Sequence, residues 1–215
     1  MKQVSAACER NKDPILAVLR RAFSDAQHVL EIGSGTGQHA VHFAQGLPHL
    51  VWHTSDLPDY HPSINEYIDE SGAPNLRRPF VLDAGRSDSA DELRRALAKN
   101  ESRSAATGGL INIDAVFTAN TIQIMSEDEV AGMFSLLKEI LMVGGRFCLY
   151  SPLQYNGRHS SPGNSEFDAA LRARAPQMGV RDFVWLNGLA EDAGLVLEAD
   201  HDMPANNRML EYRRA

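Results

Sequence analysis

Residues 29–37 read Val-Leu-Glu-Ile-Gly-Ser-Gly-Thr-Gly, and this stretch decides the fold. It is a short apolar run that carries one acid and ends in three glycines at alternate positions. Because glycine tolerates positive φ and lets a ligand approach the backbone, such a run can leave a buried parallel strand and turn sharply into a helix. The stretch therefore predicts a strand, a turn and a helix of an α/β sheet, with a ligand at the turn.

Three classes of nucleotide-type ligand compete for this turn. A phosphate-binding loop ends in Gly-Lys-Ser/Thr, whereas this turn continues Gly37-Gln38-His39 and lacks the lysine that reaches a terminal phosphate. A dinucleotide site places its third glycine three positions after the second, where this chain has Gln38. Nucleoside triphosphate binding is therefore disfavoured, and binding of NAD or FAD is weakened but stays open.

The turn also has an acid-x-Gly-x-Gly-x-Gly pattern at Glu31, Gly33, Gly35 and Gly37. This pattern resembles motif I of the class I S-adenosylmethionine-dependent methyltransferases. S-adenosyl-L-methionine has no phosphate, so a glycine turn with free backbone amides suffices, and nearby acids can meet its cationic groups. Its ribose diol needs a bidentate acceptor after the next strand, and Asp56 lies about 20 residues beyond the glycines. We therefore expect this cofactor, with Asp56 on its ribose; a turn-starting role for Asp56 is the alternative.

Length and composition indicate one globular unit. The chain has 215 residues, of which 43% are hydrophobic and 23% charged, so we expect residues 1–215 to form a single domain. The net charge is −7 without a basic stripe, which disfavours nucleic acid as a substrate. Nothing in the sequence fixes the oligomeric state.

The cysteines and histidines indicate neither a disulfide framework nor a metal site. Cys8 and Cys148 lie far apart without CxxC spacing, which fits a reducing cytosol. His39 and His42 are one helical turn apart, but no third ligand follows at an obvious spacing. No apolar run approaches the ~20 residues of a spanning helix, so we expect a cytoplasmic protein without membrane association.

Strand and helix signals alternate along the chain. Strands are expected at 28–32, 50–55, 80–82, 113–118, 146–150, 196–200 and 208–213. Helices are expected from Pro14 to Phe23, at 36–46 and 64–70, from capping boxes at Ser89 and Ser126, at 165–175, and through Trp185 to Ala193. The order predicts an α/β fold of the Rossmann-like class with helices on both faces. The resemblance at the glycine turn implies its class I methyltransferase form, a seven-stranded, mostly parallel sheet with an antiparallel C-terminal hairpin strand. The polar segment 101–109 is expected to be a flexible surface connection.

In an open parallel sheet the ligand lies outside the carboxyl ends of the strands, where the strand order reverses. Asp83 is expected there as an acceptor for the adenine amino group, and the backbone of Asn120 near the methionine part or the substrate. A turn cap at Asp83 and satisfaction of buried backbone by Asn120 are the alternatives. The cofactor-binding candidates are Glu31, Gly33, Ser34, Gly35, Thr36, Gly37, Gln38, His39, Asp56, Leu57, Asp83, Ala84, Asn120, Thr121 and Ile122.

Several separated blocks resemble the methyltransferase-like 26 family. They are residues 6–16, 31–39, 119–125 and 203–207, with 165–168 and 179–182 also similar. The resemblance implies a class I methyltransferase fold and cofactor, and it names no methyl acceptor. In the first block, we expect Arg10 and Asn11 to fold over the cofactor, with Arg10 on the methionine carboxylate; a solvated arginine is the alternative.

Methyl transfer asks little of side chains, since in-line positioning can supply the catalysis and a base is needed only when the acceptor must lose a proton early. Segment 151–164 reads as a long loop that covers the ligand, and the C-terminal hairpin turn should return to the same rim. The acceptor-side candidates are Tyr155, Asn156, Arg158, His159, Asn206 and Asn207.

The acceptor is expected to be a small molecule or an exposed protein side chain. Residues 120–123 lack the two prolines and the aromatic of the Asn/Asp-Pro-Pro-aromatic motif, which argues against methylation of a nucleobase amino group. Two other functions stay open: a nicotinamide-dependent oxidoreductase, and a non-catalytic module that binds S-adenosylmethionine.

Overall fold

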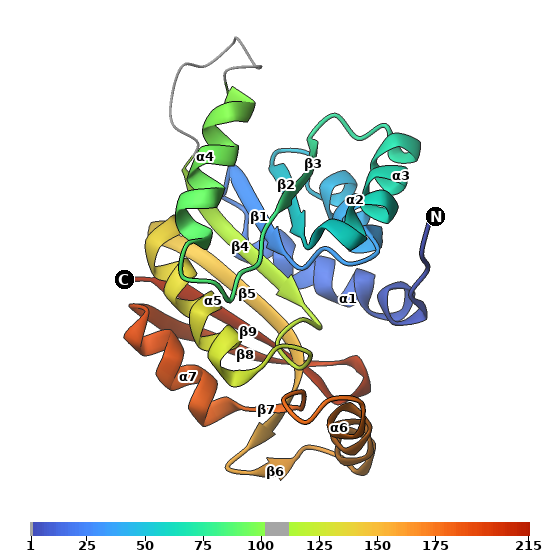
Figure 1. Cartoon of the computed structure of the whole chain (residues 1–215), viewed down its shortest axis with the longest axis vertical. Helices are drawn as coiled ribbons and strands as arrows, with labels where there is room; N and C mark the ends of the chain where they lie inside the picture. Colours follow the sequence, from blue (N-terminus) through green and yellow to red (C-terminus); the bar gives the residue numbers. More distant parts are fainter. Residues whose placement is uncertain (1, 102–111) are drawn as a thin grey trace.

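The strand predicted ahead of the glycine turn lies in the interior of the sheet, with a parallel strand on each side (Figure 1). The computed structural model describes residues 2–101 and 112–215. In it, β1 (His28–Ile32) has the predicted bounds and pairs in parallel with β2 (Val51–Asp56) and β4 (Ile113–Ala119). Every residue of β1 after the first is buried, as expected of a strand that is covered on both faces.

The main sheet runs in the order β3-β2-β1-β4-β5-β9-β8 (Figure 1). Its other strands are β3 (Leu76–Val81), β5 (Leu141–Tyr155), β8 (Leu195–Met203) and β9 (Asn207–Arg214). Strand β9 is antiparallel to both β5 and β8, whereas the pairs from β3 to β5 are parallel. The predicted mostly parallel sheet with an antiparallel C-terminal hairpin strand is confirmed. Two short strands, β6 (Arg158–His159) and β7 (Arg181–Asp182), extend it by pairing with the end of β5.

Helices cover both faces of the sheet. One face is packed by α1 (Ala6–Ala22), α2 (Gln38–Gly46) and α3 (His61–Ser71), and the other by α4 (Ser89–Glu101), α5 (Glu127–Ile140) and α7 (Phe183–Asp192). Each set shares one apolar cluster with the sheet, and α6 (Pro162–Arg174) lies beside β6 at one end (Figure 1). No described helix is long and apolar enough to cross a membrane.

The first helix starts much earlier than predicted. Helix α1 begins at Ala6, where the hydroxyl of Ser5 accepts a hydrogen bond from the N–H of Cys8 at 3.4 Å. Pro14, which was expected to open the helix, lies inside it. A proline there removes one hydrogen bond, and complete burial of Ile15 and Leu19 on the same helix outweighs that loss.

The predicted long loop at 151–164 is wrong. Strand β5 continues to Tyr155 and folds back into β6. Asn156 and Gly157 between them have φ values of 52° and 72°, which a two-residue hairpin turn requires. Ser161 then caps α6 by accepting from the N–H of Asn164. The Asn-Gly pair therefore marked a tight turn and not an open loop.

Two further predictions are corrected and one lies outside the described residues. Ser89 is the first residue of α4 and donates its hydroxyl to the carbonyl of Asp83, so it forms no capping box. The capping box at Ser126 is confirmed. Strand β3 begins at Leu76, ahead of the predicted start at 80, because residues 76 and 77 already pair with β2. The segment predicted as a connection at 101–109 falls almost wholly outside the described residues.

Candidate functional site

The turn after β1 presents main chain at the edge of the sheet. Gly33 and Gly35 have φ values of 74° and 56°, in the region that favours glycine. A Cβ on Gly33 would lie 2.6 Å from the Oγ1 of Thr121, so the turn packs closely there. A Cβ on Gly35 would meet no atom within 4 Å. The middle of the turn is therefore open to a ligand.

Asp56 ends β2 directly beside this turn. Its Oδ2 accepts a hydrogen bond from the N–H of Gly35 at 2.7 Å, and its Oδ1 accepts from the N–H of Leu57 at 2.7 Å. Burial raises the pKa of this carboxyl above its ordinary value, and the two backbone donors oppose that shift. Because each carboxylate oxygen has a second lone pair, Asp56 can hold the turn and also accept two hydroxyls from a ligand.

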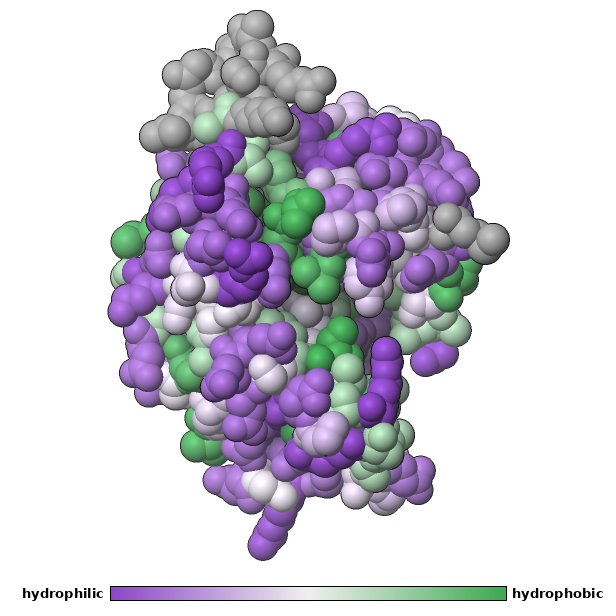
Figure 2. All heavy atoms as spheres, in the orientation of Figure 1, coloured by the Kyte–Doolittle hydropathy of each residue, from purple (hydrophilic) through white to green (hydrophobic). Residues whose placement is uncertain are grey.

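A pocket of about 500 Å³ opens where β1, β2 and β4 end. Strand order reverses at this point, since β2 and β4 lie on opposite sides of β1. Figure 2 shows this face hollowed along its middle, with apolar residues gathered there. The predicted cofactor residues that line the pocket are Gly33, Ser34, Gly35, Thr36, His39, Asp56, Leu57, Asp83, Ala84, Asn120 and Thr121.

Glu31, the acid of the glycine pattern, lies in the core behind the turn. Its side chain is buried, and its Oε2 accepts hydrogen bonds from the Oγ of Ser34 at 2.9 Å and the Nε1 of Trp52 at 3.0 Å. Burial raises the pKa of Glu31 to about 7, and these two donors oppose the shift. In this structure Glu31 positions the turn, and its predicted contact with a cofactor stays a prediction.

Five other predicted cofactor residues also lie away from the lining that the described residues form. Arg10 is exposed on α1, and the Oδ1 of buried Asn11 lies 2.7 Å from the Nε2 of His39. Gln38 accepts from the N–H of Ser5 at 2.5 Å and so fastens the start of the first helix to the turn. Of the remaining two, Gly37 immediately precedes α2. Ile122 packs in the apolar core.

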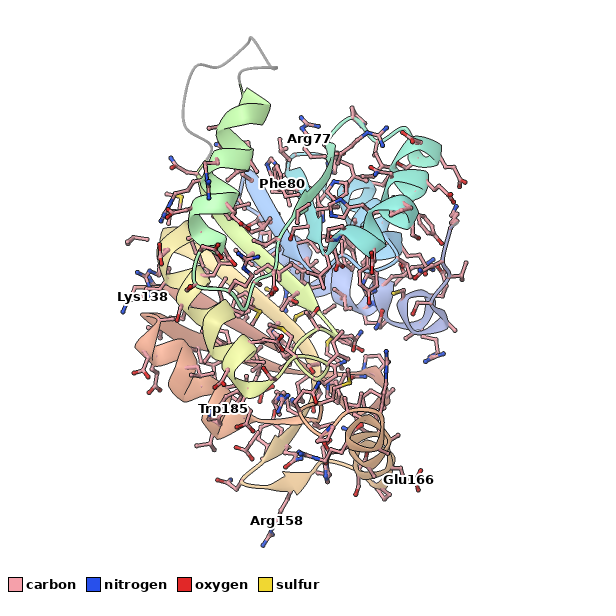
Figure 3. All side chains as sticks on the ribbon, in the orientation of Figure 1. Arg77, Phe80, Lys138, Arg158, Glu166 and Trp185 are labelled. Carbon is pink, nitrogen blue, oxygen red and sulfur yellow. The ribbon has the colours of Figure 1, made fainter. Side chains whose placement is uncertain are left out.

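The structure does not bring the acceptor-side candidates to the pocket: among the described residues, its lining includes none of the six. The hydroxyl of Tyr155 donates to Asp200 at 2.7 Å, and Asn156 forms the hairpin turn. Arg158 points away from the molecule at its far end (Figure 3). The other three are His159, which lies 3.5 Å from Asp168, and Asn206 and Asn207, at the turn between β8 and β9.

Other side chains take the place expected for those candidates. The rim carries large apolar side chains that are partly open to solvent: Tyr60, Ile124 and Phe167 are 36%, 42% and 41% exposed. Met125 and Glu129 complete this side. No sequence signal singled out Phe167, because only the fold brings α6 over the end of β4. Ile124 and Met125 follow Asn120 so closely that the strand-end argument could have included them.

Arg181 supports the segment that forms this rim. Its buried guanidinium donates to the carbonyls of Ile122 and Gln177 at 3.2 and 2.7 Å and also to that of Met125. Burial lowers the pKa of Arg181, and Glu127 at 3.6 Å opposes that shift. No metal cluster accompanies the site: within residues 2–101 and 112–215, no group of three His, Cys, Asp or Glu side chains is placed to hold an ion.

Comparison with known families identifies the chain. A family model described as "Protein of unknown function (DUF938)" matches residues 2–214. The chain belongs to this DUF938 family. The family description assigns no activity, so the fold and the pocket carry the functional argument.

Solved structures described as O-methyltransferases share the fold of this DUF938 chain. An O-methyltransferase family protein from Burkholderia thailandensis superposes over 97% of the chain with a TM-score of 0.78 and 16% identity. An O-methyltransferase family 2 protein from Planctomyces limnophilus, in complex with apigenin, superposes over 97% of the chain with a TM-score of 0.77 and 13% identity. An O-methyltransferase from neocarzinostatin biosynthesis was solved in complex with S-adenosylmethionine and 2-hydroxy-5-methyl naphthoic acid. It superposes over 97% of the chain with a TM-score of 0.72 and 14% identity. The chain spans between 55% and 58% of these proteins' lengths, and the predicted class I methyltransferase fold is confirmed.

Proposed function

We propose that this DUF938 protein is an S-adenosyl-L-methionine-dependent methyltransferase. The observation that carries the proposal is the contact between the Oδ2 of Asp56 and the N–H of Gly35 at 2.7 Å, inside the pocket at the strand-order reversal. Two features that lie far apart in sequence, a glycine turn and a carboxylate, meet there in the arrangement that a ribose and an adjoining backbone-bound group require.

The charges of the pocket favour this cofactor over a dinucleotide. Among the described residues, those that line the pocket include three carboxylates, of Asp56, Asp83 and Glu129, and no lysine or arginine. A sulfonium and an ammonium group are stabilised by such a lining, whereas a pyrophosphate is repelled by it. The apolar side chains of Leu57 and Leu82 beside Asp83 offer walls for a flat adenine.

When bound, the cofactor supplies an electrophilic methyl group on a sulfonium. The carboxylate of Asp56 would accept hydrogen bonds from the ribose hydroxyls. Because Gly35 has no side chain, the cofactor would be able to approach the main chain closely there. Ile124, Met125 and Phe167 form an apolar rim that excludes water from an acceptor placed beside the cofactor.

We further propose that the acceptor is a small molecule with an apolar surface, with an exposed protein side chain as the other class. The exposed apolar rim favours the first, and two structural neighbours are described with the flat compounds apigenin and 2-hydroxy-5-methyl naphthoic acid. The proposal also includes a single cofactor-binding domain over residues 1–215, membership of the methyltransferase-like 26 group, and action in the cytoplasm.

Calorimetric titration with S-adenosylmethionine, S-adenosylhomocysteine and NAD tests the cofactor. We expect both adenosyl compounds to bind. Asp56→Asn should raise the Kd of each by at least about tenfold, since hydrogen bonds to a charged group contribute ~1.5–3 kcal/mol. Asp59→Asn is the matched control, because Asp59 is exposed on the next turn and lies outside the pocket lining that the structure describes. Binding of NAD alone would overturn the proposal.

Turnover separates an enzyme from a binding module. Purified protein is incubated with labelled cofactor and a small-molecule extract, and methylated products are sought by mass spectrometry. We expect a labelled product that Asp56→Asn loses and Asp59→Asn keeps. Tight binding of the cofactor with no product in small-molecule or protein fractions would support the non-catalytic module instead.

A further inference from the structure

A thiol and an imidazole line the pocket, and an amide lies behind the imidazole. The Sγ of Cys8 lies 4.0 Å from the Nδ1 of His39, and the Nε2 of the same ring lies 2.7 Å from the Oδ1 of Asn11. Cys8 and His39 both line the pocket. The N-terminal start of α1 and the start of α2, which are distant in sequence, are brought together here.

The amide fixes which nitrogen of His39 carries the proton. The Oδ1 of Asn11 can only accept, so Nε2 of His39 donates to it and holds the proton of the neutral ring. The Nδ1 lone pair then faces Cys8. Asn11 is itself held by a hydrogen bond with Tyr150. The imidazole of His39 stacks on the ring of Phe43, with 5.1 Å between the ring centroids, so both a hydrogen bond and a stacked ring fix its orientation.

Burial keeps the imidazole of His39 neutral, so its Nδ1 lone pair is free to accept a proton, but the same lowering of the pKa makes the ring a weaker base. Burial lowers the pKa of His39 to about 4, with His42 and Lys12 acting in the same direction and Glu9 opposing them. Burial also raises the pKa of the Cys8 thiol, with Glu31 and Glu9 adding to the rise and Ser5 and Thr36 opposing it. The resting pair is therefore a neutral thiol beside a neutral base, and the proton moves when the sulfur reacts.

We propose that Cys8, His39 and Asn11 form a thiol-activating triad, and that Cys8 is a covalent modification site for small electrophilic carbon compounds that enter the pocket. A sulfur–carbon bond forms at Cys8 while the bond from that carbon to its leaving group breaks. The thiol proton passes to Nδ1 of His39, and the leaving group departs with the electron pair. Asn11 orients the base and stabilises the imidazolium that results.

Alkylation by iodoacetamide tests this on the native full-length protein, with Cys148 as an internal control. Cys148 is 0% exposed, and burial raises its pKa well above the ordinary value. Peptide mass spectrometry gives the rate at each cysteine. We expect Cys8 to react at least about tenfold faster than Cys148, and His39→Gln to slow Cys8 at least about tenfold, the lower range for loss of a general base.

Variants of the amide separate orientation of the base from simple stability. Asn11→Ala should slow alkylation of Cys8, and Asn11→Asp, which keeps an acceptor for Nε2, should restore it. Unfolding would expose Cys8 and accelerate its reaction, so a slower variant is not a misfolded one. Alkylation of Cys8 within twofold of wild type in His39→Gln, or no difference between the Ala and Asp variants, would overturn the triad.

Saturating S-adenosylhomocysteine distinguishes this proposal from the proposed function. Protection of Cys8 together with dependence on His39 supports both. Dependence on His39 without protection supports the triad and counts against the cofactor pocket. Protection without dependence on His39 overturns the triad and leaves the cofactor proposal standing.

Discussion

The Nε of Arg181 donates a hydrogen bond to the carbonyl of Ile122 at 3.2 Å and so joins the short strand β7 to the segment that follows β4. The same guanidinium also reaches the carbonyls of Met125 and Gln177. Arg181 is only 4% exposed, so water does not replace it as a donor. One buried cation thus shapes the rim of the pocket without touching its interior.

Replacement of Arg181 should loosen this rim and the whole fold. Arg181→Ala leaves three carbonyls without their donor and should cost about 2–4 kcal/mol of unfolding free energy. Arg181→Lys keeps the charge but lacks the planar fork, so an intermediate loss is expected. Urea unfolding measures both, with exposed Arg174→Ala on α6 as the control. Unchanged stability in Arg181→Ala would contradict this role.

The buried carboxyl of Glu31 should make stability depend on pH. Its pKa is raised to about 7 in the folded protein from an ordinary 4.5, so the folded state holds its proton more tightly than the unfolded state. The contribution of Glu31 is favourable below pH 4.5 and is lost as pH rises toward 7. Glu31→Gln, which can still accept from Trp52 and Ser34, should therefore become more stable relative to wild type across this range.

Melting temperatures of wild type and Glu31→Gln from pH 4.5 to 8 provide the measurement. His39 acts in the opposite direction, because its folded pKa of about 4 makes the protein less stable as pH falls below 6.5. That effect is common to both proteins and cancels in the difference. A difference in melting temperature that does not vary with pH would show that Glu31 is not held protonated.

The close packing at Gly33 can be tested with a pair of substitutions. Gly33→Ala places a Cβ 2.6 Å from the Oγ1 of Thr121 at a φ of 74°, and should cost about 1–3 kcal/mol. Thr121→Ala removes the clashing hydroxyl but not the backbone strain. The double variant should therefore recover part of the loss, measured as an interaction energy in urea unfolding. Strict additivity would mean that strain alone, and not contact with Thr121, requires glycine.

Phe167 should affect the acceptor and not the cofactor. Its side chain is partly exposed at the rim, so Phe167→Ala should leave stability nearly unchanged. Loss of an apolar contact of this size corresponds to about 1–2 kcal/mol, or roughly tenfold in kcat/KM for an apolar acceptor. Val184→Ala, an exposed position on α7, serves as the control. An equal effect of Phe167→Ala on the Kd for S-adenosylmethionine would assign Phe167 to the cofactor instead.

Short-range sequence patterns correctly predicted the elements that do not depend on contacts with distant parts of the chain. Strand β1 was predicted with its bounds, and Ser126 was recognised as a cap, because a run of buried apolar residues and a Ser-x-x-Glu spacing act within a few residues. The start of α1 was missed because Pro14 is also a first-turn signal, and only burial of the following residues decides between the two positions. Strand β5 was predicted too short because its continuation depends on pairing with β7 and β9.

The sequence by itself determined strand β1, the glycine turn and the carboxylate at position 56. An apolar run followed by alternate glycines is compatible with few other backbone conformations, and Asp56 comes directly after the next apolar run. Which polar side chains face the pocket was decided by tertiary structure. Glu31 belongs to the glycine pattern yet turns inward to Trp52, while Cys8 and Phe167 reach the pocket from helices that are far apart in the sequence. Hydrogen bonding of buried groups and packing between distant helices set those directions, and neither can be read from local spacing.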